Sequence, residues 1–481
     1  MNDVKNKILK ASKWAFLSEI ASKAVTPLVF VILARILSPE DYGIMNLAAM
    51  VIAFAQIFYD GGLGKALIQR QSDTEEVANI VFWTNVALGL VFYLVIFFLS
   101  PFLAVFFKDY RLINVLRVQS LVIIIYSFSS VQTALLQKKL DFKSLFWVRI
   151  ATSFLPGCAS IPLALVGYKY WALVVGIIIG GIAQVIILWM LSPWKPKFYF
   201  NIKLVKPVYR FGFFVTLEAI LTWGFIWGDS LIVGKYLGTE AVGLYRTGNY
   251  FVSTIYGFLL SPLLPILYST FSILQTDRKN LIDFYLKTVK TLSFVALPIA
   301  FGLFSINATI GAAVFGGKWI GIGPVIGFFA ILHGTSWIVG MNPDLYRAVG
   351  KPQISTIISS ISLPIYFIVY LISVKYGLVS FLSGRLILGL LMLPVHLLVA
   401  KKMLSISMIS VINSIKWFVL SALLMTTILL IIHPLVRFSF KPVTSMAIFL
   451  VVGCFIYSTV YLKESEFLKN LFFIIIKKKK D

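Results

Sequence analysis

The sequence predicts an all-α integral membrane protein with fourteen transmembrane helices, arranged as two parallel six-helix lobes and two further C-terminal helices. Composition is the first sign, because the 481-residue chain is 59% hydrophobic and only 13% charged, and its mean hydropathy is +0.92. Soluble domains carry about a quarter charged residues. The second sign is a series of apolar runs near the roughly 20 residues that cross a bilayer. The third is a short segment that recurs later in the chain.

In the first half of the chain, charged residues, glycines and prolines divide the apolar runs into six spans. The breaks read SPED, QRQSDTEE, KDYR, QKKLDFK, GYKY and SPWKPK in chain order. All of these connections are short, so we expect no separate soluble domain in this half. The predicted spans are 14–36, 43–65, 77–103, 112–135, 142–166 and 170–191.

The second half is divided in the same way, and two spans follow the second group of six. The breaks read GTE, QTDRKN, GGKW, NPDLYRAVGKP, KYG, KKM and HPLVRFSFKP. The predicted spans are 208–234, 241–267, 284–305, 322–341, 353–374, 378–400, 412–433 and 443–462.

The distribution of basic residues orients these spans. Lys and Arg total 43 against 19 Asp and Glu. With the N-terminus in the cytoplasm, most of them flank the cytoplasmic ends, as is typical of membrane proteins. We therefore expect both termini inside, with Lys477–Lys480 contacting membrane lipids. This bias explains the basic charge without nucleic acid. Cys158 and Cys454 lie in apolar runs, so neither a disulfide framework nor a metal site is expected.

A repeated corner indicates two lobes. LARILSPEDYG (33–43) and VGKYLGTEAVG (233–243) share a Leu, a Glu and a Gly in register. Six predicted spans separate them, so both copies enter the membrane in the same direction. LLQKKLDFKSL and LYRAVGKPQIS form a second pair at the same offset in spans. Two parallel lobes around a cavity are typical of transporters. In these proteins, one lobe rocks against the other and opens the binding site alternately to each side of the membrane. The predicted division is 1–200 (N-lobe), 201–403 (C-lobe) and 404–481 (two helices and a basic tail).

Charged side chains inside the spans are the candidate functional residues. Each would cost about 2.5–3.5 kcal/mol if it faced lipid at mid-bilayer, so each should face protein or water. Those residues are Glu19, Lys23, Arg117, Arg149, Glu218, Asp229, Arg246 and Arg385. They carry a net positive charge, which suits an anionic solute such as a phosphate or pyrophosphate.

Two of the predicted helices carry polar stripes that permit two interpretations each. Glu19 and Lys23 form an i,i+4 pair that could line a cavity or form an ion pair between helices. Glu218 and Asp229 could bind H⁺ or Na⁺, or could be structural acids. His333, His396 and His433 are isolated and are expected to be structural. No catalytic triad, phosphate loop or metal cluster can be read, so we expect a transporter and not an enzyme.

Several motifs resemble a known family when taken together. They are LARILSPEDYGIMNLA, FYDGGLGKALIQRQ, LLQKKLDF, GDSLIVGKYLGTEAVGLY, VFGGKW and MNPDLYRAVGKP. In this order they resemble the Wzx-type polysaccharide transporter branch of the MOP flippase superfamily. The subgroup that exports colanic-acid-type and teichuronic-acid-type repeat units is the most similar. Related flippases place cations on helices 1, 2 and 8, whereas predicted span 43–65 has none in its middle.

The resemblance implies a function. Such proteins move an undecaprenyl-pyrophosphate-linked oligosaccharide repeat unit from the inner to the outer leaflet by ion-coupled alternating access. It implies pyrophosphate or sugar contacts at Lys23, Arg149, Arg246, Arg385 and Arg117, and it makes Glu19, Glu218 and Asp229 the candidate coupling-ion sites. No cofactor is expected beyond an H⁺ or Na⁺ gradient.

The resemblance also implies a setting. We expect a monomer in the bacterial inner (cytoplasmic) membrane, with a polysaccharide polymerase and a chain-length regulator as further partners. Two alternatives stay open. A multidrug or metabolite antiporter of the same superfamily would favour an acidic binding lobe. The net positive charge of the residues inside the predicted spans opposes this alternative. A membrane polysaccharide polymerase or ligase would need a catalytic constellation.

Overall fold

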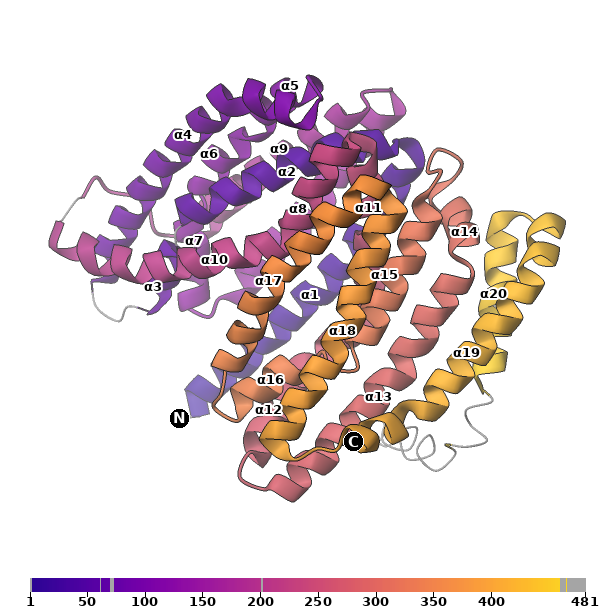
Figure 1. Cartoon of the computed structure of the whole chain (residues 1–481). Coiled ribbons are helices and arrows are strands. Elements are labelled where there is room, and N and C mark those ends of the chain that lie inside the picture. The colour runs from indigo at the N-terminus through magenta and orange to yellow at the C-terminus, as the bar shows by residue number, and fades with distance from the viewer. Residues whose placement is uncertain (1, 61, 70–72, 200–201, 459–463, 465–481) are drawn as a thin grey trace. The chain divides into compact units, whose positions relative to one another are not determined.

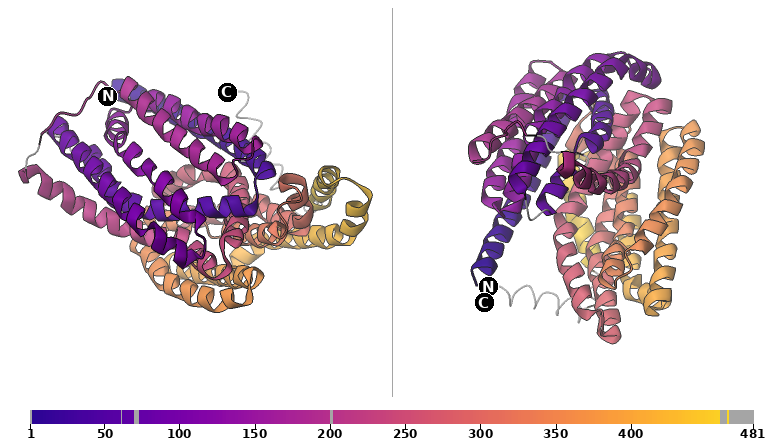
Figure 2. Two further views of the ribbon diagram at one scale, coloured as in Figure 1. Left: turned by 90° about the horizontal axis from the view of Figure 1, so that it is seen from above. Right: turned by 90° about the vertical axis from the view of Figure 1, so that its left-hand side faces the viewer.

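The chain is helical throughout the part that the structure describes. The computed structural model describes residues 2–60, 62–69, 73–199, 202–458 and 464. Every regular element in those ranges is a helix (Figure 1). Figure 2 shows from two further sides that helices lie lengthwise against one another within each part of the chain. The tail with Lys477–Lys480 lies outside the described residues.

Twelve helical segments in the described ranges are long and apolar enough to cross a membrane. They are Lys13–Ile36, Pro39–Tyr59, Thr74–Phe107, Arg111–Lys138, Phe142–Leu165, Tyr170–Leu191, Thr216–Leu237, Thr239–Leu274, Arg278–Ser305, Gln353–Tyr376, Leu378–Leu404 and Met408–Val436. Each coincides with a predicted span, which confirms an all-helical multi-pass membrane protein. Predicted spans 322–341 and 443–462 fall on two shorter apolar helices, Ile322–Ser336 and Pro442–Tyr457, so the number fourteen stays a prediction.

The chain forms two compact units, Met1–Arg246 and Thr247–Asp481. The first contains α1 (Asn2–Ile36), α2 (Pro39–Asp60), α3 (Leu63–Gln69), α4 (Thr74–Phe107), α5 (Arg111–Gln119), α6 (Leu121–Ser127), α7 (Ser130–Lys138), α8 (Phe142–Leu165), α9 (Tyr170–Leu191), α10 (Ile202–Leu237) and the start of α11 (Thr239–Leu260). The predicted division at 200 and 403 stays a prediction.

The second unit contains the rest of α11 and the helices that follow it. They are η1 (Ser261–Leu263), α12 (Leu264–Leu274), α13 (Arg278–Ser305), α14 (Asn307–Ile310), η2 (Gly311–Phe315), α15 (Ile322–Ser336), α16 (Asn342–Ala348), α17 (Gln353–Ser373), η3 (Val374–Tyr376), α18 (Leu378–Leu404), α19 (Met408–Ser439) and α20 (Pro442–Tyr457). α13 packs against α15 and α19, and α15 packs against α18.

The three histidines of the second unit take part in hydrogen bonds with neighbouring helices. His333 Nε2 lies 2.8 Å from Asn249 Oδ1, and His433 Nε2 lies 2.9 Å from Thr309 Oγ1. His396 Nδ1 lies 3.3 Å from the hydroxyl of Tyr346. These contacts support the structural role expected for all three.

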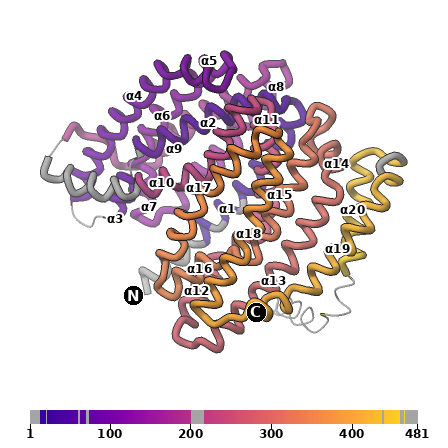
Figure 3. The backbone as a smooth tube through the Cα atoms, viewed as in Figure 1, coloured from indigo at the N-terminus to yellow at the C-terminus, as the bar shows by residue number. Residues whose placement is uncertain are grey.

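In the first unit, the fourth predicted span is divided into three short helices. The chain passes from α4 into α5, α6 and α7 in succession, as the tube in Figure 3 shows. Ser120 and Ser129 lie at the two breaks. The polar residues Ser130, Thr133 and Gln137 lie on α7, after the second break.

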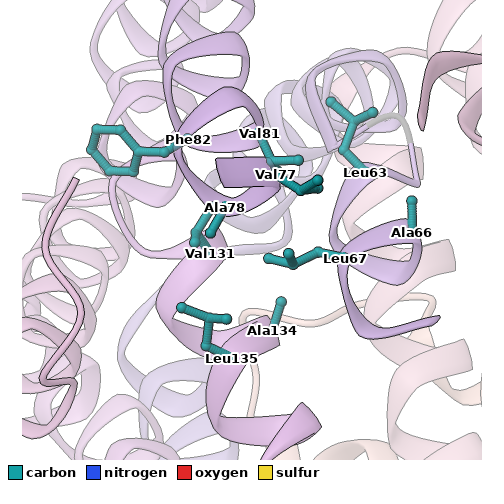
Figure 4. Close-up of a cluster of buried hydrophobic side chains, with 10 residues drawn as sticks. All are labelled: Leu63, Ala66, Leu67, Val77, Ala78, Val81, Phe82, Val131, Ala134 and Leu135. Atoms are coloured by element: carbon teal, nitrogen blue, oxygen red, sulfur yellow. The ribbon is translucent and has the colours of Figure 1, made fainter. Parts of the chain in front are cut away.

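The short helix α3 has a well-packed apolar side. α2 ends at Asp60, and the chain turns through Gly62, whose φ of 67° favours glycine. α3 then buries Leu63, Ala66 and Leu67 against α4 and α7 (Figure 4). Their partners in the cluster are Val77, Ala78, Val81, Phe82, Val131, Ala134 and Leu135. The packing leaves the opposite side of α3 exposed.

The two copies of the repeated corner contact each other. A Cβ added to Gly43 would lie 1.9 Å from the carbonyl oxygen of Thr239. A Cβ added to Gly243 would lie 1.7 Å from the carbonyl oxygen of Pro39. These residues are equivalent in the repeat, so each glycine packs on the same backbone position of the other copy. The corner was predicted as two similar loops, and the structure shows why glycine occupies the same place in both.

Polar contacts surround this junction. Ser38 and Asp41 form a capping box at the start of α2: the backbone N–H of Asp41 donates to Ser38 Oγ (3.2 Å), and that of Ser38 donates to Asp41 Oδ2 (2.9 Å). Asp109 accepts hydrogen bonds from Arg111 Nε (2.9 Å) and Thr239 Oγ1 (2.8 Å). Burial alone would raise the pKa of Asp109, but these hydrogen bonds and the charge of Arg111 hold that pKa below its usual value.

Candidate functional site

The first unit contains a polar cavity of about 740 Å³. Side chains from α2, α3, α6, α7, α9 and α10 line it, together with Ser129 between α6 and α7. Most of the polar ones carry an amide or a hydroxyl group, and Lys65 is the one charged residue among the lining residues that the structure describes. They are Gln56, Tyr59, Lys65, Tyr126, Ser129, Ser130, Thr133, Gln137, Gln184 and Thr216. Such a wall offers many hydrogen-bond donors and acceptors and very little charge.

A smaller cavity of about 330 Å³ adjoins the first. The two share Ala53, Ile57, Lys65 and Ala219. The additional residues of the smaller cavity come from α10 and are mostly apolar or aromatic. They are Glu218, Thr222, Trp223, Ile226 and Trp227. The larger cavity is thus richer in amide and hydroxyl side chains, and the smaller one adds two indole rings, an isoleucine, a threonine and a carboxylate.

Hydrogen bonds fix several wall residues before any ligand binds. Gln184 Nε2 donates to Ser129 Oγ (3.3 Å), and Asn85 Nδ2 donates to Ser130 Oγ (2.8 Å). Trp223 Nε1 donates to the carbonyl of Met50 (3.2 Å), and its ring centroid lies 4.9 Å from that of Phe54. These contacts hold α7, α9 and α10 in the positions that shape the cavity.

The cavities lie toward the end of the first unit that is opposite the repeated corner. Gly43, which packs in that corner, and Gln56, which lines the larger cavity, both belong to α2. Thirteen residues separate them, which is about 20 Å of helix. The first unit is thus tightly packed at the corner and hollow at the other end.

The predicted cations of the first helix form an ion cluster with a later helix. Glu19 Oε1 lies 3.1 Å from Lys23 Nζ, and Glu19 Oε2 lies 3.0 Å from Arg149 Nη1. Arg149 belongs to α8, which packs against α1. The sequence left open a cavity wall or an ion pair between helices at Glu19 and Lys23, and the structure shows the ion pair, with Arg149 as the partner from the other helix. One carboxylate shared by two cations leaves net positive charge at this surface, where the Arg149 side chain is 52% exposed.

The other predicted cations contact aromatic rings or backbone. Arg117 Nε donates to Ser100 Oγ (3.1 Å), joining α5 to α4. Arg246 Nη1 donates to the carbonyl of Ile226 (2.9 Å), and its guanidinium lies 3.9 Å from the ring centroid of Trp227, a wall residue of the smaller cavity. Arg385, in the second unit, lies 5.3 Å from the ring centroid of Phe329. None of the five predicted cations lines either cavity.

The two predicted acids of α10 have different surroundings. Glu218 lines the smaller cavity, and no ion pair of its carboxylate is found among the described residues. Asp229 is 2% exposed and accepts hydrogen bonds from the hydroxyls of Tyr245 (2.7 Å) and Ser230 (2.9 Å). The contacts of Asp229 favour the structural interpretation, whereas the position of Glu218 in the cavity wall leaves both interpretations open.

Sequence reasoning missed Lys65 and the uncharged wall residues. Lys65 closes the apolar run 43–65 and looks like an ordinary flanking cation. The glycines of the DGGLG motif, which directly precede it, were the available signal, because they turn the chain before α3. Gln56, Gln137 and Gln184 carry no charge, so the search for charged residues within spans could not find them. No group of metal-ligating side chains occurs in the described ranges.

Comparison with known proteins identifies the family. Residues 32–324 match the family described as polysaccharide biosynthesis protein. The succinoglycan biosynthesis transport protein ExoT of Rhizobium meliloti is 28% identical over 67% of this chain and 65% of its own length, so this match spans less than two thirds of that relative. The teichuronic acid biosynthesis protein TuaB of Bacillus subtilis is 24% identical over 81% of this chain and 84% of its own length.

Solved structures support the fold. The lipid II flippase MurJ in an inward closed conformation matches 96% of this chain and 100% of its own, with a TM-score of 0.74 and 17% identity. A multidrug resistance MATE family transporter of the MOP superfamily matches 86% of this chain and 98% of its own, with a TM-score of 0.58 and 15% identity. The family match covers more than half of the chain, and the protein therefore belongs to the polysaccharide biosynthesis protein family.

Proposed function

We propose that this transporter moves an undecaprenyl-pyrophosphate-linked oligosaccharide repeat unit from the inner to the outer leaflet by ion-coupled alternating access. The observation that carries the proposal is the cavity of about 740 Å³ inside a membrane-spanning unit, lined by amides and hydroxyls with a single lysine. Sugar hydroxyls both donate and accept hydrogen bonds, and amide and hydroxyl side chains do the same. The family assignment supports a lipid-linked saccharide as the solute.

The pyrophosphate would interact with the cationic side chains predicted from the sequence. Lys23 and Arg149 line neither cavity, so we expect them to attract the pyrophosphate before it enters, because Glu19 neutralises only part of their combined charge. Arg246 is the next candidate, since its guanidinium packs on the ring of Trp227, which lines the smaller cavity. Arg117 and Arg385 stay predicted contacts of the same group. An Arg guanidinium can bind a phosphate through two parallel hydrogen bonds, which a Lys cannot do.

Glu218 is our candidate for the coupling-ion site. A carboxylate inside a membrane-spanning unit can bind a proton, and with other oxygens it can hold Na⁺. Glu218 lines the smaller cavity beside Thr222, whose hydroxyl could contribute such an oxygen. Glu19 and Asp229 are weaker candidates, because Glu19 is shared by two cations and Asp229 is held by neighbouring hydroxyls.

We place the protein in the bacterial inner membrane, with both termini in the cytoplasm. In that orientation the repeated corner lies at the outer end, and the polar cavity lies toward the cytoplasm, where lipid-linked repeat units are assembled. We expect a monomer that works beside a polysaccharide polymerase and a chain-length regulator.

A deletion strain tests the proposed function. We expect lipid-bound repeat units to accumulate on the cytoplasmic side and surface polysaccharide to disappear, with both restored by the plasmid-borne gene. A strain that keeps its polysaccharide and loses resistance to cationic drugs would instead support the multidrug antiporter alternative. The fold similarity to a multidrug transporter keeps that alternative open, while the larger cavity has no carboxylate among its described lining residues, which opposes it.

A further inference from the structure

We propose that Lys65 binds the anionic linkage between sugar and lipid, with the sugar in the larger cavity and the first isoprene units in the smaller one. The proposal rests on the proposed function and assigns parts of the substrate to particular walls. Lys65 is one of four residues that line both cavities, and the other three are Ala53, Ile57 and Ala219. A cation at this boundary suits a molecule whose only negative group lies between a polar part and an apolar part.

The two walls differ in the way that such a molecule requires. The larger cavity offers amides from three helices, Gln56, Gln137 and Gln184, and hydroxyls between them. The smaller cavity offers the indole rings of Trp223 and Trp227 and the side chain of Ile226. Amides and hydroxyls replace the water around a sugar, while indoles and aliphatic groups gain contact area from a prenyl chain.

The charge of Lys65 is available to a ligand. Lys23, Arg149 and Arg111 each have a carboxylate oxygen within 3.1 Å, whereas Lys65 has no such partner among the described residues. Glu218 lines the same smaller cavity without forming an ion pair with Lys65. An exposed cation in a membrane-spanning unit with no carboxylate partner is costly unless a ligand or water compensates its charge.

The packing and hydrogen bonds of α3 fix the position of Lys65. The buried side of this helix packs in the apolar cluster of α4 and α7 (Figure 4). Lys138 Nζ donates to the carbonyl of Leu67 (3.3 Å) in the last turn of α3 and to Thr74 Oγ1 (2.7 Å) at the start of α4. Lys138 is thus a positioning residue, and Lys65 is held toward the cavities before the ligand arrives.

Binding of defined probes to the full-length protein in nanodiscs tests the anion assignment. The probes are farnesyl diphosphate, which carries both groups, farnesol, which lacks the anion, and inorganic diphosphate as a competitor. We expect Lys65→Gln to weaken farnesyl diphosphate binding about 10-fold or more, as is typical for loss of a charge-assisted hydrogen bond. Farnesol binding should be unchanged, and Lys65→Arg should retain most of the affinity. Lys139→Gln is the matched control, because it removes an exposed charge just beyond α7 that lines neither cavity.

Two further variants test the walls separately. Ile226→Asn should weaken farnesol and farnesyl diphosphate alike and leave competition by inorganic diphosphate intact. Gln137→Ala should weaken binding of a farnesyl diphosphate that bears one hexose and spare farnesyl diphosphate itself. The assignment is overturned if Lys65→Gln binds farnesyl diphosphate as tightly as Lys139→Gln does, or if the wall variants affect the opposite probes. That outcome leaves the proposed function standing, since the deletion strain tests that function separately through the accumulation of lipid-bound repeat units.

Discussion

The reciprocal glycine contact at the repeated corner leads to a quantitative prediction. A Cβ at Gly43 would lie 1.9 Å from the carbonyl oxygen of Thr239, whereas ordinary contacts begin at 3.4 Å, so the two backbones would have to part by about 1.5 Å. Gly243→Ala would force a similar separation from the carbonyl oxygen of Pro39. Both obstacles are backbone atoms of helix ends, which cannot swing aside as a side chain can.

We expect each single substitution to destabilise the protein by about 2–3 kcal/mol, in the upper part of the range for overpacking. The double substitution should cost clearly less than the two single values combined, because the separation forced by one alanine makes room for the other. Non-additivity is the sharper part of the prediction, since it follows from the reciprocal geometry and from no other feature of the two sites.

The assay is unfolding of the purified protein by SDS titration, followed by far-ultraviolet circular dichroism. Gly257→Ala in α11 is the matched control, because a Cβ there meets no atom within 4 Å. Alanine favours a helix over glycine by about 0.5–1 kcal/mol, so this control should be neutral or slightly stabilising. If Gly43→Ala and Gly243→Ala behave like the control, or if their effects simply add, the reciprocal contact is absent from the protein in solution.

Three other experiments test the remaining features. Glu218→Gln should remove the dependence of transport on a proton or sodium gradient, measured in proteoliposomes; an unchanged dependence would move the coupling site elsewhere. Arg149→Ala should reduce surface polysaccharide at an unchanged protein level, and Arg149→Lys should restore it only in part, because a lysine lacks the paired donors of a guanidinium. Full activity of Arg149→Ala would remove it from the pyrophosphate contacts. A cysteine at Tyr110, 75% exposed between α4 and α5, should react with an impermeant reagent from outside, and one at Lys279 should react only after permeabilisation. The reverse pattern would invert the proposed orientation.

The spans could be predicted because hydropathy depends on composition alone. Apolar runs and their breaks placed all twelve confirmed spans to within a few residues at most ends. Hydropathy does not report where a helix bends inside an apolar run. Predicted span 112–135 is therefore three short helices, and predicted span 43–65 ends as α2 with Lys65 on a separate α3.

The site was harder to predict because its main features depend on tertiary contacts. The i,i+4 spacing of Glu19 and Lys23 permitted an ion pair or a cavity wall, and it could not identify Arg149, which joins them from 130 residues away. The amides of the larger cavity gather from three helices, and each one alone resembles an ordinary polar residue in a membrane span. The repeated corner was recognised as a repeat, while its reciprocal packing became visible only in three dimensions.

Leaflet-to-leaflet movement of a fluorescent undecaprenyl-diphosphate-linked sugar, measured in liposomes that contain the purified protein, tests the central claim most directly. We predict that the wild-type protein moves the lipid across the bilayer well above the protein-free rate, and that Lys65→Gln slows this movement at least about 10-fold while Lys139→Gln does not. A wild-type rate equal to that of protein-free liposomes, with an ion gradient of either kind imposed, would contradict the proposed function.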